Sequence, residues 1–238
     1  AKQVIIQRIR EVEREIVREE FTDRVGELMT GSVQRVEGRN VFVEVGRAIG
    51  VMGPDDQIHS ERYYIGQRLR VMLREVDPEG RAAQLLLTRS HPDFVRRLFE
   101  LEVPEIHAGT VEIKSVAREA GVRTKVAVAS NQDGVDPVGT CVGQRGTRVQ
   151  AIMAELGEEK IDIVLYDEDP VTYITNALSP AKISKITLDE PTKTASINVA
   201  DDQLSLAIGR GGQNVRLAGD LTGWQLDIEK SEAQKKAE

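Results

Sequence analysis

Apolar positions follow a helical period in residues 1–21 and a strand period in residues 22–90. In the first range, Ile5, Ile9, Val12 and Ile16 stand at i, i+4, i+7 and i+11, which predicts one helix. In the second range, apolar and polar residues alternate, which predicts strands. We expect five strands, at residues 25–36, 41–45, 48–52, 69–76 and 83–89.

Five short strands in residues 22–90 fit a small closed barrel of the OB type, which we expect to be antiparallel. Residues 1–21 then form a connector helix before the barrel, and we interpret its alternating charges as a solvated face. Alternation places Phe42 opposite the valine face, on the outside of the barrel. There it could stack on a base, or it could cover the barrel or pack on a neighbouring domain.

Residues 91–166 and 167–230 share the order α-β-β-α-α-β, which predicts two α+β domains. Each would have a three-stranded sheet covered by helices on one face. The short acidic break at residues 167–170 predicts that the two domains are packed together rather than loosely tethered. The charged tail, residues 231–238, is expected to fray.

A repeated stretch lies within these two domains, at residues 136–149 and 202–215. Each copy has an acidic residue, Asp136 or Asp202, seven positions before a Gly-x-x-Gly, and the copies are offset by 66 residues. We expect each acidic residue to cap a short helix that the first glycine ends. The second glycine would open another helix, whose free N–H groups and positive dipole end face the loop.

Such a loop lets a phosphate chain approach the backbone closely, as in the loops with which KH domains clamp single-stranded nucleic acid. We predict that backbone N–H groups of residues 143–146 and 209–212 hold phosphates, that arginines add charge, and that polar residues in the next helical turn reach base edges. The predicted RNA-binding residues are Gly143, Gln144, Arg145, Gly146, Arg148, Gly209, Arg210, Gly211, Gly212, Gln213 and Asn214, with Phe42 on the barrel.

The motif by itself is weak evidence, because four residues match easily by chance. A third match, Gly50–Gly53, has no helical flanks, and we interpret it as a turn. The evidence therefore lies in the repeated helical context, against the alternative of two ordinary helix–helix turns. Apolar floors beside the loops would come from Val142, Val149 and Ile152 and from Ile208, Val215 and Ala218, unless these residues are simply core.

Composition narrows the possible partners. The formal charge of −7 opposes non-specific binding to polyanions, so a nucleic-acid site must be local. A single cysteine excludes an internal disulfide and fits a reducing compartment, and no apolar run is long enough to predict a membrane span. We expect a cytoplasmic protein. Its first residue is Ala rather than Met, which suggests a piece of a longer chain.

These features resemble the NusA family of bacterial transcription elongation and antitermination factors. The resemblance rests on Cys141–Gln150 and Ala207–Arg216, on a barrel like the S-one type at Gly38–Val45 and Leu85–Arg89, and on two units like type II KH domains. It implies binding of nascent single-stranded RNA and modulation of pausing, termination and antitermination. Implied partners are RNA polymerase, mostly through an N-terminal domain that this sequence lacks, and other elongation or antitermination factors.

One stretch departs from the resemblance. Barrels of this type often carry an apolar-His-x-Ser-Glu stretch after the third strand, where this chain has residues 51–54, and His59-Ser60-Glu61 comes later. We therefore rank the barrel below the KH pair as an RNA site.

Two rival functions stay open. An RNA-binding accessory subunit of an RNA-processing or exonuclease assembly would share these domains, and a protein-interaction scaffold would leave its RNA loops idle. The three histidines are scattered, no phosphate-binding Gly-x-x-x-x-Gly-Lys motif occurs, and Cys141 alternates with Ala207 in the repeat. We therefore predict no enzyme activity, no catalytic residue, no metal and no cofactor.

Overall fold

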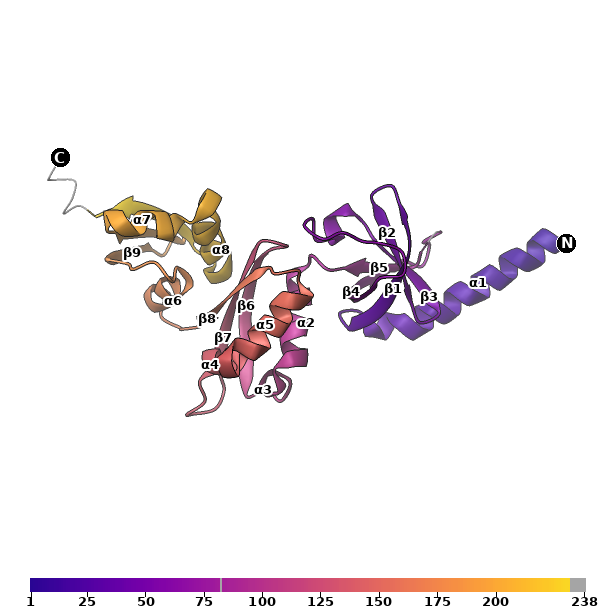
Figure 1. Ribbon diagram of the computed structural model, residues 1–238, viewed down its shortest axis with the longest axis horizontal. Coiled ribbons are helices and arrows are strands. Elements are labelled where there is room, and N and C mark those ends of the chain that lie inside the picture. The colour runs from indigo at the N-terminus through magenta and orange to yellow at the C-terminus, as the bar shows by residue number, and fades with distance from the viewer. Residues whose placement is uncertain (82, 232–238) are drawn as a thin grey trace. The chain divides into compact units, whose positions relative to one another are not determined.

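The computed structural model describes residues 1–81 and 83–231 (Figure 1). Contacts divide the chain into two compact units, Ala1–Leu98 and Phe99–Glu238. Most of the predicted charged tail, from residue 232 onward, lies outside the described residues.

A closed five-stranded barrel forms most of the first unit, as predicted. Its strands are β1 (Leu28–Glu37), β2 (Asn40–Val45), β3 (Ala48–Met52), β4 (Arg68–Val76) and β5 (Leu85–Thr88), in the order β1-β2-β3-β5-β4. The expectation of a wholly antiparallel barrel is wrong, because β3 and β5 pair in parallel. A closed ring with an odd number of strands cannot alternate direction throughout, so one parallel pair is unavoidable.

The predicted N-terminal helix is α1, Lys2–Phe21. Its last turns reach the barrel, where Val17 and Phe21 join the buried barrel cluster. The other apolar residues on the predicted stripe stay exposed, from 41% for Ile16 to 61% for Ile5. Two short 3-10 turns, Thr22–Arg24 and Pro54–Asp56, belong to the same unit.

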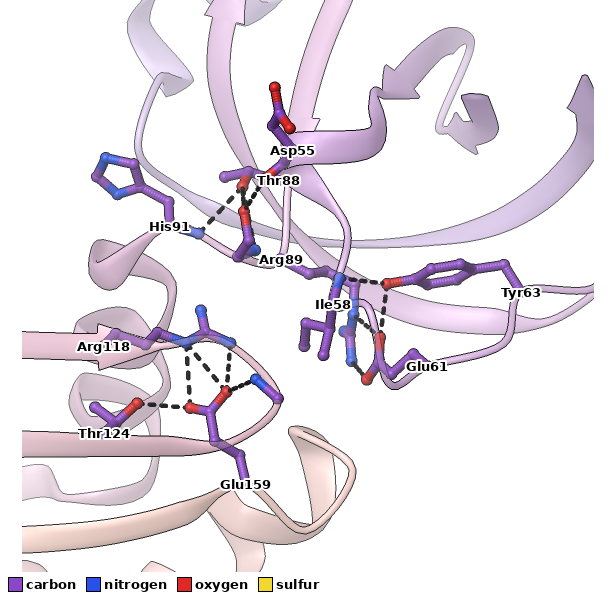
Figure 2. Close-up of polar contacts among 12 residues, drawn as sticks. Asp55, Ile58, Glu61, Tyr63, Thr88, Arg89, His91, Arg118, Thr124 and Glu159 are labelled. Atoms are coloured by element: carbon purple, nitrogen blue, oxygen red, sulfur yellow. Dashed lines mark hydrogen bonds and ion pairs between the residues drawn. The ribbon is translucent and has the colours of Figure 1, made fainter. Parts of the chain in front are cut away.

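A largely buried ion pair between Glu61 and Arg89, the residue after β5, stabilises the barrel (Figure 2). Arg89 donates to both carboxylate oxygens of Glu61, at 2.9 and 2.5 Å, and Tyr63 donates to Glu61 at 2.8 Å. Burial, with Glu61 beside it, raises the pKa of the Tyr63 hydroxyl. The displaced His59-Ser60-Glu61 stretch thus contributes an internal contact through Glu61.

The first α+β domain contains α2 (Pro92–Glu102), α3 (Pro104–His107), β6 (Val111–Glu119), β7 (Arg123–Ser130), α4 (Pro137–Val142), α5 (Thr147–Glu155) and β8 (Lys160–Leu165). The short helix α3 was not predicted. Its sheet has the order β6-β7-β8, with β6 antiparallel and β8 parallel to the central strand.

The second domain repeats this topology with α6 (Pro170–Ala177), β9 (Lys185–Asp189), β10 (Thr194–Val199), α7 (Asp201–Ile208), α8 (Gln213–Thr222) and β11 (Gln225–Lys230). The central strand β10 pairs antiparallel with β9 and parallel with β11. The predicted elements are therefore present in both domains, with bounds that differ by a few residues.

Strand β7 is buried on both faces, which joins the two domains into one unit. Ala127 and Val164, on one face of the first sheet, belong to the same apolar cluster as Leu217 of α8. On that face Lys125, whose side chain is fully buried, donates to Asp162 at 3.0 Å. Burial lowers the pKa of Lys125, although Asp162 opposes this effect. The two domains thus share an apolar core, and a partly buried ion pair lies on the same face of the first sheet.

A fully buried ion pair in the first domain joins Arg118 of β6 to Glu159, the residue before β8 (Figure 2). Glu159 accepts from Arg118 at 3.1 Å, from the Thr124 hydroxyl at 2.7 Å and from the Gly121 N–H at 2.5 Å. The side chains of Arg118 and Glu159 are both fully buried. Removing one partner of such a pair leaves an uncompensated buried charge.

We predict that Glu159→Ala lowers the free energy of unfolding by about 3–5 kcal/mol, because Arg118 would lose its buried partner. Urea unfolding followed by Trp224 fluorescence measures this change, since the only tryptophan lies in the second unit. The control is Glu112→Ala, which breaks an exposed pair with Lys114 and should cost less than about 1 kcal/mol. Equal losses in the two variants would contradict the prediction.

Candidate nucleic-acid interface

The two Gly-x-x-Gly loops have nearly the same backbone. The first glycines have φ and ψ of 78° and 170° at Gly143, and of 75° and 173° at Gly209. The third loop residues, Arg145 and Gly211, have φ of 54° and 60°, and the fourth, Gly146 and Gly212, both have φ of 75°. Three of the four residues in each loop thus have positive φ, a region that glycine adopts without steric cost.

The helix before each loop begins differently in the two copies. Asp136 caps α4 as predicted, because its carboxylate accepts from the Val138 N–H at 3.1 Å, and Pro137 takes the first helical position. The prediction that Asp202 caps α7 is wrong. Helix α7 begins at Asp201 and has no side-chain cap, so Asp202 lies inside its first turn, where its charge still suits the helix dipole.

Only the central residues of each loop offer backbone donors. The Gly143 N–H donates to Gly139 O at 3.0 Å, and the Gly146 N–H donates to Gly143 O at 3.1 Å. The N–H groups of Gln144 and Arg145 donate to no group of the described residues. We predicted that the N–H groups of all four loop residues hold phosphates, but those of Gly143 and Gly146 are used inside the domain. Gln144 and Arg145 are therefore the loop residues whose N–H groups can bind a phosphate.

The second loop uses its donors in the same way. Gly209 and Gly212 donate to Ser205 O and Gly209 O, at 2.9 and 3.2 Å. Arg210 and Gly211 are exposed, like Gln144 and Arg145 in the first loop. Each loop therefore presents two adjacent N–H groups and an exposed arginine side chain, a combination that suits a phosphate.

The residue five positions after each first glycine, Arg148 or Asn214, binds carbonyl groups of the preceding helix. Arg148 donates to Thr140 O at 2.8 Å and to Glu105 at 3.0 Å. Asn214, which is 3% exposed, donates to Leu206 O, Ala207 O and Leu178 O at 3.1–3.2 Å. The prediction that Asn214 reaches base edges is wrong, because its amide is buried under the loop, and Arg148 is committed to internal acceptors.

The first glycine of each motif leaves room for this tie. A Cβ atom at Gly143 would lie 2.7 Å from Cγ of Arg148, and one at Gly209 would lie 2.7 Å from Cβ of Asn214. A Cβ atom at Gly212 would meet nothing within 4 Å, and one at Gly146 would make ordinary contacts with the side chains of Gln150 and Val149, at 3.6 and 3.9 Å. The first glycines therefore serve packing inside the domain, whereas the second ones keep open the space outside the loop.

Gln213 contacts the neighbouring domain instead of standing free. Its amide donates to Glu119 of β6 at 3.4 Å, and Glu119 also accepts from Arg216. Sequence reasoning missed Glu119, because nothing in its local pattern distinguishes it from other exposed strand carboxylates. This contact connects the helix that follows the second loop to the sheet of the first domain.

The predicted apolar floors divide into two groups. Val142, Val149, Ile208 and Val215 are half-buried beside the loops. Ile152 and Ala218 are fully buried, so they belong to the core rather than to a floor. Cys141 is likewise buried, and burial raises the pKa of its thiol to about 12.

The expectation that Phe42 offers a free face to a base is wrong. Phe42 lies outside the barrel cluster, as the alternation predicts, but it is only 5% exposed. Its cross-strand neighbour Arg35 places its guanidinium carbon 3.9 Å from the ring centroid. A cation–π contact therefore occupies the face that would have stacked on a base.

Within residues 1–81 and 83–231, no group of three His, Cys, Asp or Glu side chains could hold a metal ion. No helix there has the length and apolar character needed to cross a membrane.

The geometry defines a class of protein: an OB-type barrel followed by two type II KH domains with matching Gly-x-x-Gly loops. Residues 89–166 match the model of the NusA-like first KH domain, and residues 170–236 match that of the NusA-like second KH domain. With more than half of its length covered by these two matches, the chain belongs to the NusA family.

Curated relatives agree with this assignment, and each carries the name transcription termination/antitermination protein NusA. The chain is 50% identical over 236 residues to that of Halalkalibacterium halodurans, covering 99% of the chain and 62% of the relative. Identity is 48% over 228 residues with Bacillus subtilis, covering 96% and 62%, and 48% over 232 residues with Thermus thermophilus, covering 97% and 60%. The chain therefore spans less than two thirds of these relatives.

We predict that Asn214→Ala lowers the free energy of unfolding by about 1–3 kcal/mol, because three carbonyls lose a donor and two of these hydrogen bonds are buried. Urea unfolding with Trp224 fluorescence is the measurement. Gln213→Ala, which removes one long contact at the adjacent position, should cost less than about 0.5 kcal/mol. If Asn214→Ala proved no more costly than this control, the tie between α7 and α8 would have no energetic importance.

We predict that Cys141 resists alkylation in the folded protein. A thiol with a pKa of about 12 holds only about one thiolate in ten thousand at pH 8, against about a quarter for a free cysteine. Iodoacetamide labelling at pH 8 should be at least about a hundred times slower in native buffer than in urea. The pKa of the Cys141 thiol is higher in the folded than in the unfolded chain, so the protonated thiol favours the folded state. Its contribution to the free energy of unfolding is complete below about pH 8.5 and is lost as the pH rises toward 12. Equal labelling rates in the two buffers would contradict the burial of this thiol.

Proposed function

We propose that this chain is the RNA-binding part of a transcription factor that binds nascent single-stranded RNA and modulates pausing, termination and antitermination by RNA polymerase. The observation that carries the proposal is the matched pair of loops, each with two free backbone donors, an exposed arginine and an open second glycine. The name that the relatives carry, transcription termination/antitermination protein NusA, supports the transcriptional role.

In this proposal, the loops hold the RNA backbone and do not read its sequence. The N–H groups of Gln144 and Arg145, and those of Arg210 and Gly211, donate to phosphate oxygens, while the helix N-termini that follow supply favourable dipoles. The arginine side chains add charge-assisted hydrogen bonds. Half-buried Val142 and Val149, and their counterparts Ile208 and Val215, give bases an apolar surface beside each loop.

The shared core bears on how the two loops act together. Because the KH domains form one compact unit, binding at one loop holds the RNA near the other without the entropy of a flexible linker. RNA polymerase and other elongation or antitermination factors are the proposed protein partners, and the cytoplasm is the proposed compartment. No enzymatic step is part of the proposal.

The test compares two double variants, Gly146→Asp with Gly212→Asp, and Gly146→Asn with Gly212→Asn. Asp and Asn have similar size and both tolerate positive φ, so they share the backbone cost and differ in charge. A carboxylate about 4 Å from a phosphate is repelled by about 1–4 kcal/mol, so the Asp pair should bind unpaired RNA at least about tenfold more weakly than the Asn pair.

Fluorescence anisotropy with a short unpaired RNA, titrated over salt, measures this difference. The wild type should show a shallow salt dependence, with a slope of about −0.7 for each phosphate contacted. Equal affinity of the folded Asp and Asn variants would exclude phosphates from the loops. Absence of binding by the wild type to a varied pool of single strands would favour the scaffold function.

A further inference from the structure

The segment between β3 and β4 exposes two adjacent large apolar side chains. Ile65 is 71% exposed, more than any other large apolar residue in the described ranges 1–81 and 83–231, and Tyr64 is 64% exposed. A single exposed apolar residue is ordinary on a protein surface, but two neighbours in one turn form a contiguous patch. We call Tyr64 and Ile65 the apolar tip.

Hydrogen bonds hold the turn that carries the apolar tip. The Gln67 N–H donates to Tyr64 O at 3.1 Å, and Gly66 has a φ of 86°, as at the third position of a type II β-turn. The Gln67 side-chain oxygen accepts from the Tyr64 N–H at 3.2 Å. The turn is also joined to β1, because the Gly66 N–H donates to Val33 O at 2.8 Å and the Val33 N–H donates to Gln67 O at 2.9 Å.

The residue before the apolar tip anchors the turn to the barrel. Tyr63 packs against the barrel cluster, and its hydroxyl accepts from the Ile58 N–H at 3.1 Å while donating to Glu61 (Figure 2). The tip is thus fixed on both sides, by Tyr63 before it and by the pairing with β1 after it. Such a preorganised surface loses little conformational entropy when a partner binds.

Positive charge flanks the apolar tip. Arg62 and Arg68 are both exposed, and within residues 1–81 and 83–231 neither forms an ion pair. Glu61, which precedes Arg62, is bound to Arg89 instead. Glu44 lines the same surface pocket as Arg68 but does not pair with it. The tip therefore combines apolar surface with two arginines that can accept carboxylate partners.

We propose that the apolar tip is a docking site for an acidic, amphipathic segment of a partner protein. Apolar side chains of the segment pack on Tyr64 and Ile65, and its carboxylates pair with Arg62 and Arg68. An exposed tyrosine beside arginines is typical of the centre of a protein interface. The proposal goes beyond RNA binding and does not depend on the KH loops.

The exposed isoleucine favours a protein over a nucleic acid at this tip. Bases bind side chains mainly by stacking on a flat aromatic or guanidinium surface, which a branched aliphatic side chain does not offer. Burial of Ile65 against another apolar surface is favourable, because it removes apolar area from water. A protein partner therefore uses both residues of the tip, whereas an RNA strand would use Tyr64 alone.

A peptide-display selection provides the probe for this proposal. Random peptides of about sixteen residues, long enough for an amphipathic helix, are selected on the wild-type chain and counter-selected on the Tyr64→Ser, Ile65→Ser variant. We expect the enriched peptides to carry Asp and Glu beside apolar residues at helical spacing. A selection that enriches no peptide, or peptides without acidic residues, would contradict the proposal.

Fluorescence anisotropy with an enriched peptide then compares matched variants. Tyr64→Ser with Ile65→Ser should weaken binding at least about tenfold, because both apolar anchors are lost. The control is Val4→Ser with Ile5→Ser, which removes two side chains of similar exposure, 69% and 61%, from α1 and should leave the affinity unchanged. Equal losses in the two variants would show that the peptide binds apolar surface without preference for the tip.

Two further measurements test the charges and the fold. Arg62→Gln with Arg68→Gln should weaken peptide binding and make it less dependent on salt, because the ion pairs at the rim are lost. Unchanged affinity and salt dependence would remove the acidic character from the proposed partner. Circular dichroism checks that every variant keeps the wild-type secondary structure.

Titration with unpaired RNA separates this site from an RNA contact. The Tyr64→Ser, Ile65→Ser variant should bind RNA as tightly as the wild type does. If it binds RNA at least about tenfold more weakly, the tip contacts RNA and the docking proposal is overturned. Failure of the wild type to bind RNA would instead refute the proposed function, and the peptide titrations would still decide whether the tip binds protein.

Discussion

Each KH domain depends on a close approach between two helices at a glycine. At Gly143 and Gly209 the absent side chain leaves the space that the residue five positions later fills, with a virtual Cβ only 2.7 Å away. That residue, Arg148 or Asn214, then donates to the carbonyl three positions before the glycine. The contact holds the second helix against the end of the first and so fixes the backbone shape of the loop between them.

The same constraint explains why two different side chains occupy one structural position. Arg148 extends past the helix end to Glu105 of α3, whereas Asn214 is short and ends among three carbonyls. Both satisfy carbonyl groups that a helix leaves unpaired at its C-terminus. Stabilisation therefore comes from donor geometry at a fixed offset from the glycine, and the charge of Arg148 is not essential to this role.

Electrostatics in this chain are local rather than global. The excess of acidic residues disfavours a broad contact with a polyanion, but the loops offer N–H groups whose partial charge does not depend on the net charge. The fully buried pair Arg118–Glu159 and the partly buried pair Lys125–Asp162 use their charges internally. The loop arginines Arg145 and Arg210 are, by contrast, exposed.

The sequence alone determined the order of elements, the closed barrel and the repeated loop, because apolar periodicity and glycine position are local properties of the chain. Alternation does not reveal strand direction, whereas closure of a five-stranded barrel requires one parallel pair, β3 with β5. Periodicity also placed Phe42 on the correct side of its strand. It could not show that Arg35, across a bulged pair, covers the ring. Nor could it show that Asn214 turns inward or that Gln213 meets Glu119 of another domain. Periodicity indicates which side of a helix or strand a residue occupies. The residue that it contacts on that side depends on packing between segments distant in sequence, so only the tertiary structure decides the contact.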